Sequence, residues 1–150
     1  MTLRPGLKPE TLAVHAGSTL DPATGSPTPP IYRTSAFAFG SVEEMIETFS
    51  GRRDRYIYSR YANPTVASAE ERLAALEGAE GSVAFASGMA ALTASFLAVL
   101  GAGDHLIVQR DLYGGTTRLL EKVFPRLGVE VSFVGIDEIE QPQRLRRANR

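Results

Sequence analysis

The chain has 150 residues, of which 43% are hydrophobic and 22% charged, and its 16 basic and 17 acidic side chains give a formal net charge of −1. This composition excludes disordered and fibrous proteins and fits one globular domain or part of a larger one. The near-neutral balance attracts neither nucleic acid nor an anionic membrane, so neither partner is expected. The absence of cysteine excludes disulfides and thiolate chemistry, which fits a reducing cytoplasm.

The first 40 residues hold most of the nine prolines. Because proline fixes φ and lacks a backbone donor, the run 26–30 excludes a helix or a central strand. We therefore expect an extended arm. Segment 1–17 has no continuous apolar stretch of the kind found in secretory signals, and no apolar run reaches the roughly 18 residues of a membrane span. A cytoplasmic location is the resulting expectation.

A short helix is predicted to follow the arm. Ser41 and Glu44 have the Ser-x-x-Glu spacing of a capping box, and apolar Ile46 and Phe49 follow at helical spacing. We expect this helix to end near Gly51.

Aromatic and arginine side chains interleave over residues 52–61. Alternation predicts that Tyr58 and Arg60 lie on one face of an extended segment and Tyr61 on the other. A phenol and a guanidinium on one face can bind phosphate oxygens together. The alternative is an aromatic-rich strand with a solvated arginine, and spacing alone favours that alternative.

The rest of the chain predicts an α/β fold. Asn63 and Pro64 indicate the start of a helix that Gly78 ends. Beyond it, strands are predicted over 82–86, 105–109 and 129–134, alternating with helices over 89–100 and 116–127. Strands that alternate with helices across short connections form a mostly parallel sheet with flanking helices. The arginine-rich segment 140–150 fits a solvated helix or a frayed end better than a nucleic-acid patch.

Residues Ser87, Gly88 and Met89 stand at a predicted strand-to-helix junction. Backbone N–H groups at a helix start suit a phosphate, and a glycine there allows close approach. Most such turns contain glycine for steric reasons alone, so both interpretations stay open. There is no GxGxxG or GxxxxGK[ST] pattern, so a nicotinamide or ATP site, and with it a Rossmann-type nucleotide binder, is not expected.

Tyr113 follows the predicted strand 105–109, at the strand end where α/β sheets place ligands, and two glycines follow it. A turn with a packed tyrosine is an equally good interpretation. His15 and His105 are isolated in the sequence, so both are expected to be structural and no metal site is predicted.

Taken in order, these motifs are far more specific than each one alone. Segments 11–17 (TLAVHAG), 30–32 (PIY), 58–65 (YSRYANPT), 86–91 (ASGMAA) and 111–116 (DLYGGT) resemble the N-terminal part of the transsulfuration family of pyridoxal 5′-phosphate (PLP) enzymes. This Cys/Met metabolism family includes cystathionine γ-synthase, cystathionine γ-lyase, methionine γ-lyase and the O-acylhomoserine sulfhydrylases. The resemblance runs from about residue 11 to residue 134.

The resemblance implies a role for each matched residue. Gly88 and Met89 match the backbone donors that hold the PLP phosphate. Tyr58 and Arg60 match a pair that reaches from one subunit to the phosphate bound by its neighbour. Tyr113 matches the tyrosine that stacks on the pyridine ring and assists proton transfer, which makes it the expected catalytic residue.

The resemblance also implies the architecture. Residues 62–150 would form an incomplete PLP-binding large domain of the aspartate-aminotransferase-like (type I) fold. Residues 1–61 would form an N-terminal arm and short helix that cross a subunit interface. Members of the family assemble as homodimers and homotetramers, so the same assembly is expected of a full-length parent.

The implied chemistry is γ-replacement or elimination on homoserine esters or cystathionine, as in methionine biosynthesis and cysteine metabolism. Gly115 stands where methionine γ-lyases have cysteine, which favours the other members. The Schiff-base lysine of the family lies beyond the matching residues, and the chain's two lysines are Lys8 and Lys122. The expectation is therefore a truncated chain of such an enzyme, and a non-catalytic remnant is the alternative.

Overall fold

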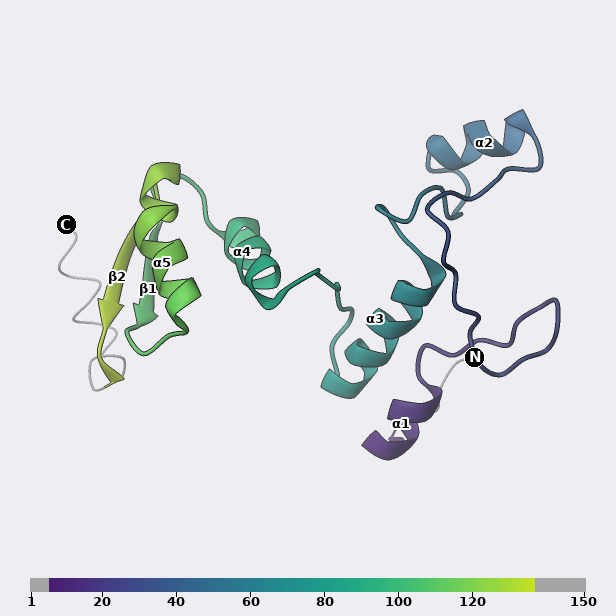
Figure 1. Ribbon diagram of the computed structural model, residues 1–150, viewed down its shortest axis with the longest axis horizontal. Coiled ribbons are helices and arrows are strands. Elements are labelled where there is room, and N and C mark those ends of the chain that lie inside the picture. The colour runs from purple at the N-terminus through teal and green to yellow at the C-terminus, as the bar shows by residue number, and fades with distance from the viewer. Residues whose placement is uncertain (1–5, 137–150) are drawn as a thin grey trace. The chain divides into compact units, whose positions relative to one another are not determined.

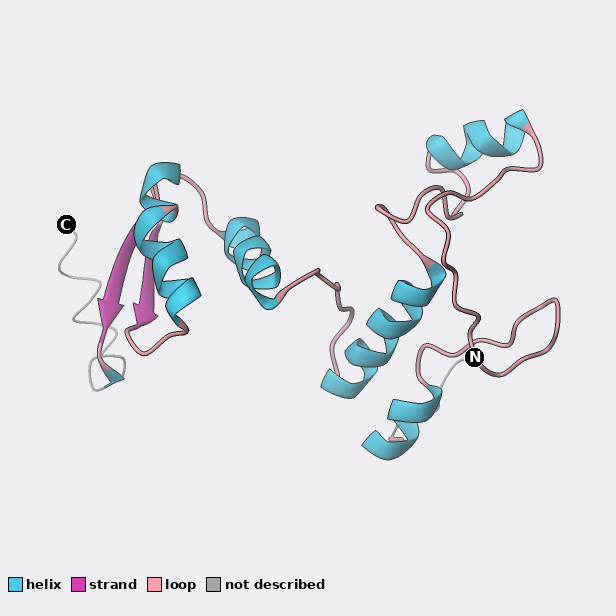
Figure 2. Cartoon of the chain, viewed as in Figure 1, coloured by secondary structure: helices cyan, strands magenta, loops and turns pink. Residues whose placement is uncertain are grey.

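The computed structural model describes residues 6–136, which fall into two compact units on either side of the Ala84–Phe85 bond. Each unit is described by itself. The first unit contains helices α1 (Pro9–His15), α2 (Val42–Phe49) and α3 (Pro64–Glu77) (Figure 1). The second contains helix α4 (Gly88–Val99), strand β1 (His105–Gln109), helix α5 (Gly114–Lys122), the 3₁₀ helix η1 (Phe124–Leu127) and strand β2 (Glu130–Val134) (Figure 2).

Helix α1 lies in the arm, so the prediction of a wholly extended arm is wrong over residues 9–15. Pro9 stands in the first turn, where its missing N–H removes no hydrogen bond, and Glu10 places a negative charge at the positive end of the helix. The helix has only seven residues. A segment this short is stable only when it packs on another element.

Helix α1 packs on α3, and the residues that follow α1 are also bonded to α3. Arg72 of α3 donates from Nε to the carbonyl oxygen of Ala16 and from Nη2 to Oγ of Ser18, both at 2.9 Å. Ala16 is buried. Gly17 has a φ of 65°, and a Cβ there would lie 2.1 Å from the carbonyl oxygen of Ser68. This close approach of the two backbones requires glycine at position 17.

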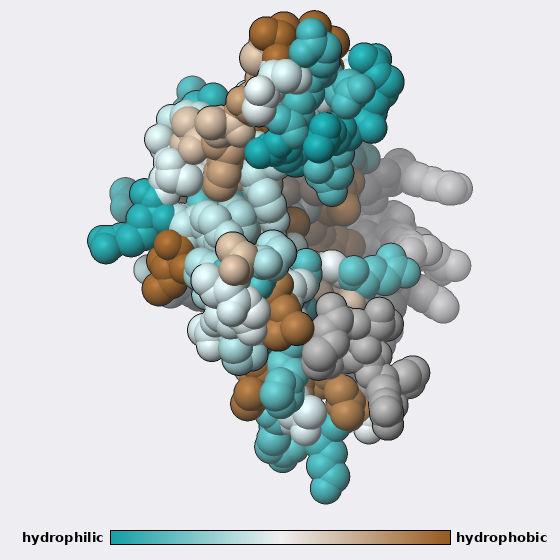
Figure 3. Space-filling model, turned by 90° about the vertical axis from the view of Figure 1, so that its right-hand side faces the viewer, coloured by the Kyte–Doolittle hydropathy of each residue, from teal (hydrophilic) through white to brown (hydrophobic). Residues whose placement is uncertain are grey.

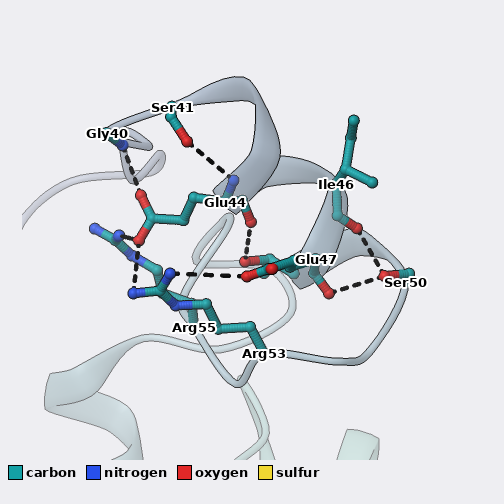
Figure 4. A network of polar contacts seen from close by, with 9 residues as sticks. Gly40, Ser41, Glu44, Ile46, Glu47, Ser50, Arg53 and Arg55 are labelled. Atoms are coloured by element: carbon teal, nitrogen blue, oxygen red, sulfur yellow. Dashed lines mark hydrogen bonds and ion pairs between the residues drawn. The ribbon is translucent and has the colours of Figure 1, made fainter.

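Helix α2 forms where the capping pattern predicts it. Oγ of Ser41 accepts the N–H of Glu44 at 3.1 Å. The reciprocal bond is displaced by one residue, because Oε2 of Glu44 accepts from the N–H of Gly40 at 2.7 Å (Figure 4). The helix ends at Phe49, and Gly51 takes the left-handed conformation that turns the chain away.

Helix α3 confirms its predicted bounds. Oδ1 of Asn63 caps it by accepting the N–H of Thr65 at 2.9 Å, and Pro64 occupies its first turn. Gly78 ends it with a φ of 64°. Asparagine at the N-cap and glycine at the C-terminal end are thus the residue types that favour the two ends of a helix.

Strands β1 and β2 pair in parallel, and α5 and η1 connect them (Figure 2). This is the βαβ arrangement that the alternation of strands and helices predicts. Leu106 pairs with Val131, and Val108 with Phe133. The core of the unit consists of three buried residues, Leu120, Phe124 and Val129, and the partly buried side chains packed against them: Phe96, Leu100, Leu106, Val108, Leu112, Leu119, Val131 and Phe133.

The strand predicted over 82–86 is absent, and this part of the sequence prediction is wrong. A strand needs a neighbouring strand for its backbone groups, and within residues 6–136 the only named pairing is that of β1 with β2. The N–H of Ala84 is instead satisfied by Oε1 of Glu70 at 2.7 Å, and Oγ of Ser82 donates to the Glu70 carbonyl at 2.7 Å.

The helix predicted over 116–127 begins earlier and is interrupted. It starts at Gly114, and α5 ends at Lys122. Pro125 has no N–H to continue the α-helical ladder, so the chain passes into the tighter η1.

Large apolar side chains are exposed on the first unit. Figure 3 shows hydrophobic side chains gathered over α2, next to strongly hydrophilic ones. Val42, Ile46 and Phe49 of α2 are each more than half exposed. No helix within residues 6–136 combines the length and the apolar character needed to cross a membrane.

Candidate functional site

The start of α4 presents backbone donors that the helix itself does not pair. Ser87 has an extended backbone, and its Oγ accepts the N–H of Ala90 at 3.1 Å. The N–H groups of Gly88 and Met89 lie in the first turn of α4. No carbonyl of the helix lies before them to accept their hydrogen bonds, so they have no partner within the helix. A Cβ at Gly88 would have no neighbour within 4 Å, so no side chain packs against the Cβ side of this glycine. Such donors, at the positive end of a 12-residue helix, suit an anion.

Tyr113 forms the N-cap of α5. Its carbonyl oxygen accepts the N–H groups of Thr116 and Thr117 at 2.8 and 3.1 Å. Its side chain is 74% exposed and makes no capping hydrogen bond. The backbone of Tyr113 therefore anchors the helix, while its phenol group stays accessible. This is not the packed tyrosine of the alternative interpretation.

The starts of α4 and α5 lie together in the second unit. Oγ1 of Thr116 donates to Sδ of Met89 at 3.7 Å. A Cβ at Gly115 would lie 3.3 Å from Sδ of Met89 and 2.6 Å from Cε1 of Tyr113. The structure thus brings both Met89 and Tyr113 beside one glycine. Sequence reasoning missed Thr116, which is buried and joins the two helices, because nothing marks a threonine as a long-range partner of methionine.

In the first unit, Tyr58 and Arg60 also lie together. The guanidinium carbon of Arg60 is 5.1 Å from the centre of the Tyr58 ring and 5.4 Å from that of Tyr61. Both distances are those of cation–π contacts. The expected separation of Tyr61 onto the opposite face is wrong, because residues 59–61 form a turn, in which the Tyr61 N–H donates to the Tyr58 carbonyl at 2.9 Å. Within residues 6–136, Arg60 takes part in none of the ion pairs, which leaves its guanidinium uncommitted to a carboxylate.

Backbone bonds to the arm hold the segment before this turn. Tyr58 forms an antiparallel bridge with Ala36, and the Ser59 N–H donates to the Ser35 carbonyl at 2.8 Å. The Phe37 N–H donates to the carbonyl of Ile57 at 3.1 Å. The arm and the segment that carries Tyr58 therefore form one continuous local structure.

A charged cluster holds the same segment further back. Glu44 pairs with Arg53 at 3.1 Å and with Arg55 (Figure 4). Arg55 also donates from Nη2 to the Ala38 carbonyl at 3.2 Å. The backbone N–H of Gly40 lowers the pKa of Glu44 below its usual value, and Arg55 and Arg53 lower it further. Glu44 is thus held in its charged form at neutral pH.

His105 makes a side-chain contact across the sheet. Nε2 of His105 lies 2.8 Å from Oγ of Ser132 on the neighbouring strand, a cross-strand bond within the sheet. Over the described residues 6–136, no group of three or more His, Cys, Asp or Glu side chains could hold a metal ion.

Comparison with known proteins gives several matches. Residues 10–149 match a family model described as Cys/Met metabolism PLP-dependent enzyme. O-acetyl-L-homoserine sulfhydrylase from Corynebacterium glutamicum is 45% identical over 125 residues, which cover 83% of this chain and 29% of that protein. L-methionine gamma-lyase from Fusobacterium nucleatum subsp. nucleatum is 40% identical over 139 residues, which cover 93% of this chain and 35% of that protein.

A solved structure also matches. The crystal structure of cystathionine gamma-lyase from Lactobacillus plantarum, complexed with L-serine, superposes with a TM-score of 0.77 at 36% identity. The match covers 92% of this chain and 34% of that one. The chain therefore spans about a third of the length of the relatives it matches. The extent of the family match, almost the whole chain, shows that this protein belongs to the Cys/Met metabolism PLP-dependent enzyme family.

Proposed function

We propose that the start of α4 binds the phosphate of PLP and that the intact protein catalyses γ-replacement or elimination on a homoserine ester or cystathionine. The observation that carries this proposal is the juxtaposition of the α4 and α5 starts around Gly115. It places backbone donors that the helix does not pair and an accessible phenol in one unit. Family membership supports the choice of PLP over other phosphorylated ligands.

The residues present fit the cofactor. A phosphate needs several donors, and the Gly88 and Met89 N–H groups have no helical acceptor, while the Cβ position of Gly88 has no neighbour within 4 Å. The pyridine ring of PLP needs an accessible aromatic ring to stack on, and the Tyr113 ring is exposed. When bound, PLP supplies an electron sink for carbanionic chemistry at the substrate.

Arg60 and Tyr58 are proposed to complete the phosphate site from a neighbouring subunit. Two aromatic faces orient the guanidinium, which leaves its N–H edge for an anion. A guanidinium binds phosphate through charge-assisted hydrogen bonds, which are stronger than neutral ones. The assembly that this arrangement needs, a homodimer or homotetramer, is part of the proposal.

Tyr113 is the proposed catalytic residue. Its side chain is exposed and its ring lies beside Gly115 at the start of α5, and its phenol hydroxyl would move a proton near the γ-substituent of the substrate. Gly115 lies inside the Tyr113–Thr116 turn. Because methionine γ-lyases have cysteine at the matching position, this glycine favours a synthase, a sulfhydrylase or cystathionine γ-lyase over methionine γ-lyase. The match to an L-methionine gamma-lyase at 40% identity leaves this choice as a prediction.

The proposal is tested by assaying the intact protein with PLP. O-acetylhomoserine with sulfide tests γ-replacement, and cystathionine tests elimination. Formation of homocysteine in the first assay, or of an oxo acid and ammonia in the second, is the expected result. Tight PLP binding with neither reaction would instead favour a non-catalytic remnant, and equal affinity for PLP and unphosphorylated pyridoxal would contradict the phosphate site.

The two lysines of the sequence give a further test. Covalent catalysis needs an amine beside the cofactor. Lys8 precedes α1 in the first unit, and Lys122 lies at the end of α5, away from its Tyr113 start. A polypeptide of these 150 residues alone is therefore expected to show no turnover. Turnover that survives replacement of both Lys8 and Lys122 by arginine would contradict this expectation.

A further inference from the structure

We propose that Asn63 is a positioning residue for phosphate recognition: its side-chain amide fixes the turn that carries Tyr58 and Arg60. This inference rests on the proposed function, because it assumes that Arg60 contacts the cofactor phosphate. It adds a role to Asn63 beyond the helix cap that its sequence position predicts.

The side-chain amide of Asn63 is buried, and both its nitrogen and its oxygen have hydrogen-bond partners. Only 6% of the residue is exposed. Its Nδ2 donates to the Tyr32 carbonyl at 3.1 Å and to Oγ of Ser59 at 2.9 Å, while Oδ1 accepts the Thr65 N–H at 2.9 Å. Both N–H groups and the oxygen therefore have partners, one in the arm, one in the turn and one at the start of α3.

The directions of the surrounding bonds require a donor at this position. The hydroxyl of Ser59 donates its single hydrogen to the Thr34 carbonyl at 2.5 Å, so towards Asn63 it can only accept. The carbonyl of Tyr32 is likewise an acceptor. A carboxylate at position 63 would face two acceptors without a hydrogen to offer either of them.

The turn lies between two attachments. On one side, Arg55 is held by Glu44 (Figure 4) and by the Ala38 carbonyl. On the other side, the Asn63–Ser59 bond closes a loop over residues 59–63, which contains Arg60. Since Arg60 lies inside this loop, loss of the Nδ2 donors frees the Asn63 end of the turn. The attachments of Arg55, Tyr58 and Ser59 to the arm remain.

Asn63→Asp separates positioning from capping. The substitution preserves size and keeps an oxygen that caps α3, because aspartate is as good an N-cap as asparagine, but it removes both donors. Arg72→Met is the matched control. Arg72 also joins α3 to the arm through two side-chain bonds, but to Ala16 and Ser18, away from the turn.

The test measures the dissociation constants of PLP and of unphosphorylated pyridoxal for the intact apoprotein. We expect Asn63→Asp to weaken PLP binding about tenfold, which corresponds to roughly 1.4 kcal/mol, and to leave pyridoxal binding unchanged. Arg72→Met should change neither constant. In an Arg60→Ala background, Asn63→Asp should cause no further loss, because its effect passes through Arg60.

The outcomes separate this inference from the proposed function. If Arg60→Ala does not weaken PLP binding, the assignment of Arg60 to the phosphate is wrong and the role of Asn63 falls with it. If Arg60→Ala weakens binding and Asn63→Asp does not, or if the two losses add, only the role of Asn63 is wrong. Ser59→Ala provides a milder second variant, which removes one partner of Nδ2 and should weaken PLP binding in the same direction even if Asn63→Asp does not fold.

Discussion

The ring of Tyr113 occupies the space that a side chain at Gly115 would fill. A Cβ built on Gly115 would lie 2.6 Å from Cε1 and 3.2 Å from Cδ1 of that ring. The backbone of Gly115 is not in the left-handed region, so its conformation alone does not demand glycine. A side chain at position 115 would instead meet the tyrosine ring beside the start of α5.

Gly115→Ala should therefore displace the Tyr113 ring without unfolding the protein. The ring is exposed and can rotate, and alanine favours the helix, so the change in stability should stay within about 0.5 kcal/mol. We expect kcat to fall about tenfold because the proton-transfer group moves, and PLP binding to weaken as well because the Tyr113 ring is also the proposed stacking partner of the cofactor.

Gly114→Ala is the matched control for that substitution. It lies in the same helical turn, and its added Cβ would meet nothing within 4 Å. It should leave kcat unchanged. An equal fall of kcat in both variants would show that the loss comes from the helix backbone and not from the tyrosine ring.

Ser87→Ala should destabilise α4 by removing its N-cap. The hydroxyl accepts the Ala90 N–H, and loss of such a cap costs about 1 kcal/mol. Urea unfolding of the intact protein measures the change. Ser95→Ala in the same helix is the control, because Ser95 only donates back to the Ala91 carbonyl and alanine is the better helix former there. A loss of stability as large in Ser95→Ala as in Ser87→Ala would contradict the capping role.

The ion pairs of Glu44 predict a dependence of stability on pH. Its pKa lies below its ordinary value of 4.5 in the folded chain, first because of the Gly40 N–H and then because of Arg55 and Arg53. A carboxyl group with a lowered folded pKa stabilises the protein at pH values above 4.5, and this stabilisation is lost as the pH falls through the folded pKa. Glu44→Gln should therefore be less stable than the parent at neutral pH and lose less stability on acidification.

The measurement is urea unfolding of both proteins across the acidic range. The difference between their free energies of unfolding should shrink as the pH falls below 4.5. A difference that stays constant with pH would mean that Glu44 acts only through its shape and its uncharged hydrogen bonds.

Local signals predicted most of the helices and strands. Ser41, Asn63 and Ser87 all cap the helices that they were expected to start, and Gly78 ends α3. These devices act within a few residues, so the sequence carries them directly. The strand at 82–86 failed for the opposite reason, since a strand exists only if a distant segment pairs with it.

The candidate site was less accessible to sequence reasoning than the fold. The cap of Asn63 on Thr65 spans two residues and was predictable, whereas its bond to the Tyr32 carbonyl spans 31. The contact of Met89 with Thr116 spans 27 residues. No periodicity or spacing rule encodes such contacts, because they depend on how whole segments pack.

The proposed sharing of a site between subunits predicts complementation of two inactive variants. Arg60→Ala should weaken PLP binding, because a charge-assisted bond to phosphate contributes roughly 1.5–3 kcal/mol. Tyr113→Phe should keep PLP and turn over slowly, because it removes only the phenol hydroxyl. Each variant alone carries its lesion in every site of the assembly.

A mixed dimer of the two variants distributes the lesions unequally. If Arg60 serves the neighbouring subunit, one site receives both lesions, and the other combines an intact Arg60 with an intact Tyr113. Half of randomly mixed dimers are hybrids with one intact site of two, so co-expression should restore about a quarter of the parental activity. If both residues instead served the site of their own subunit, every site of the hybrid would keep one lesion and activity would not rise. Verified hybrids without recovered activity would therefore place Arg60 outside the neighbouring subunit's site.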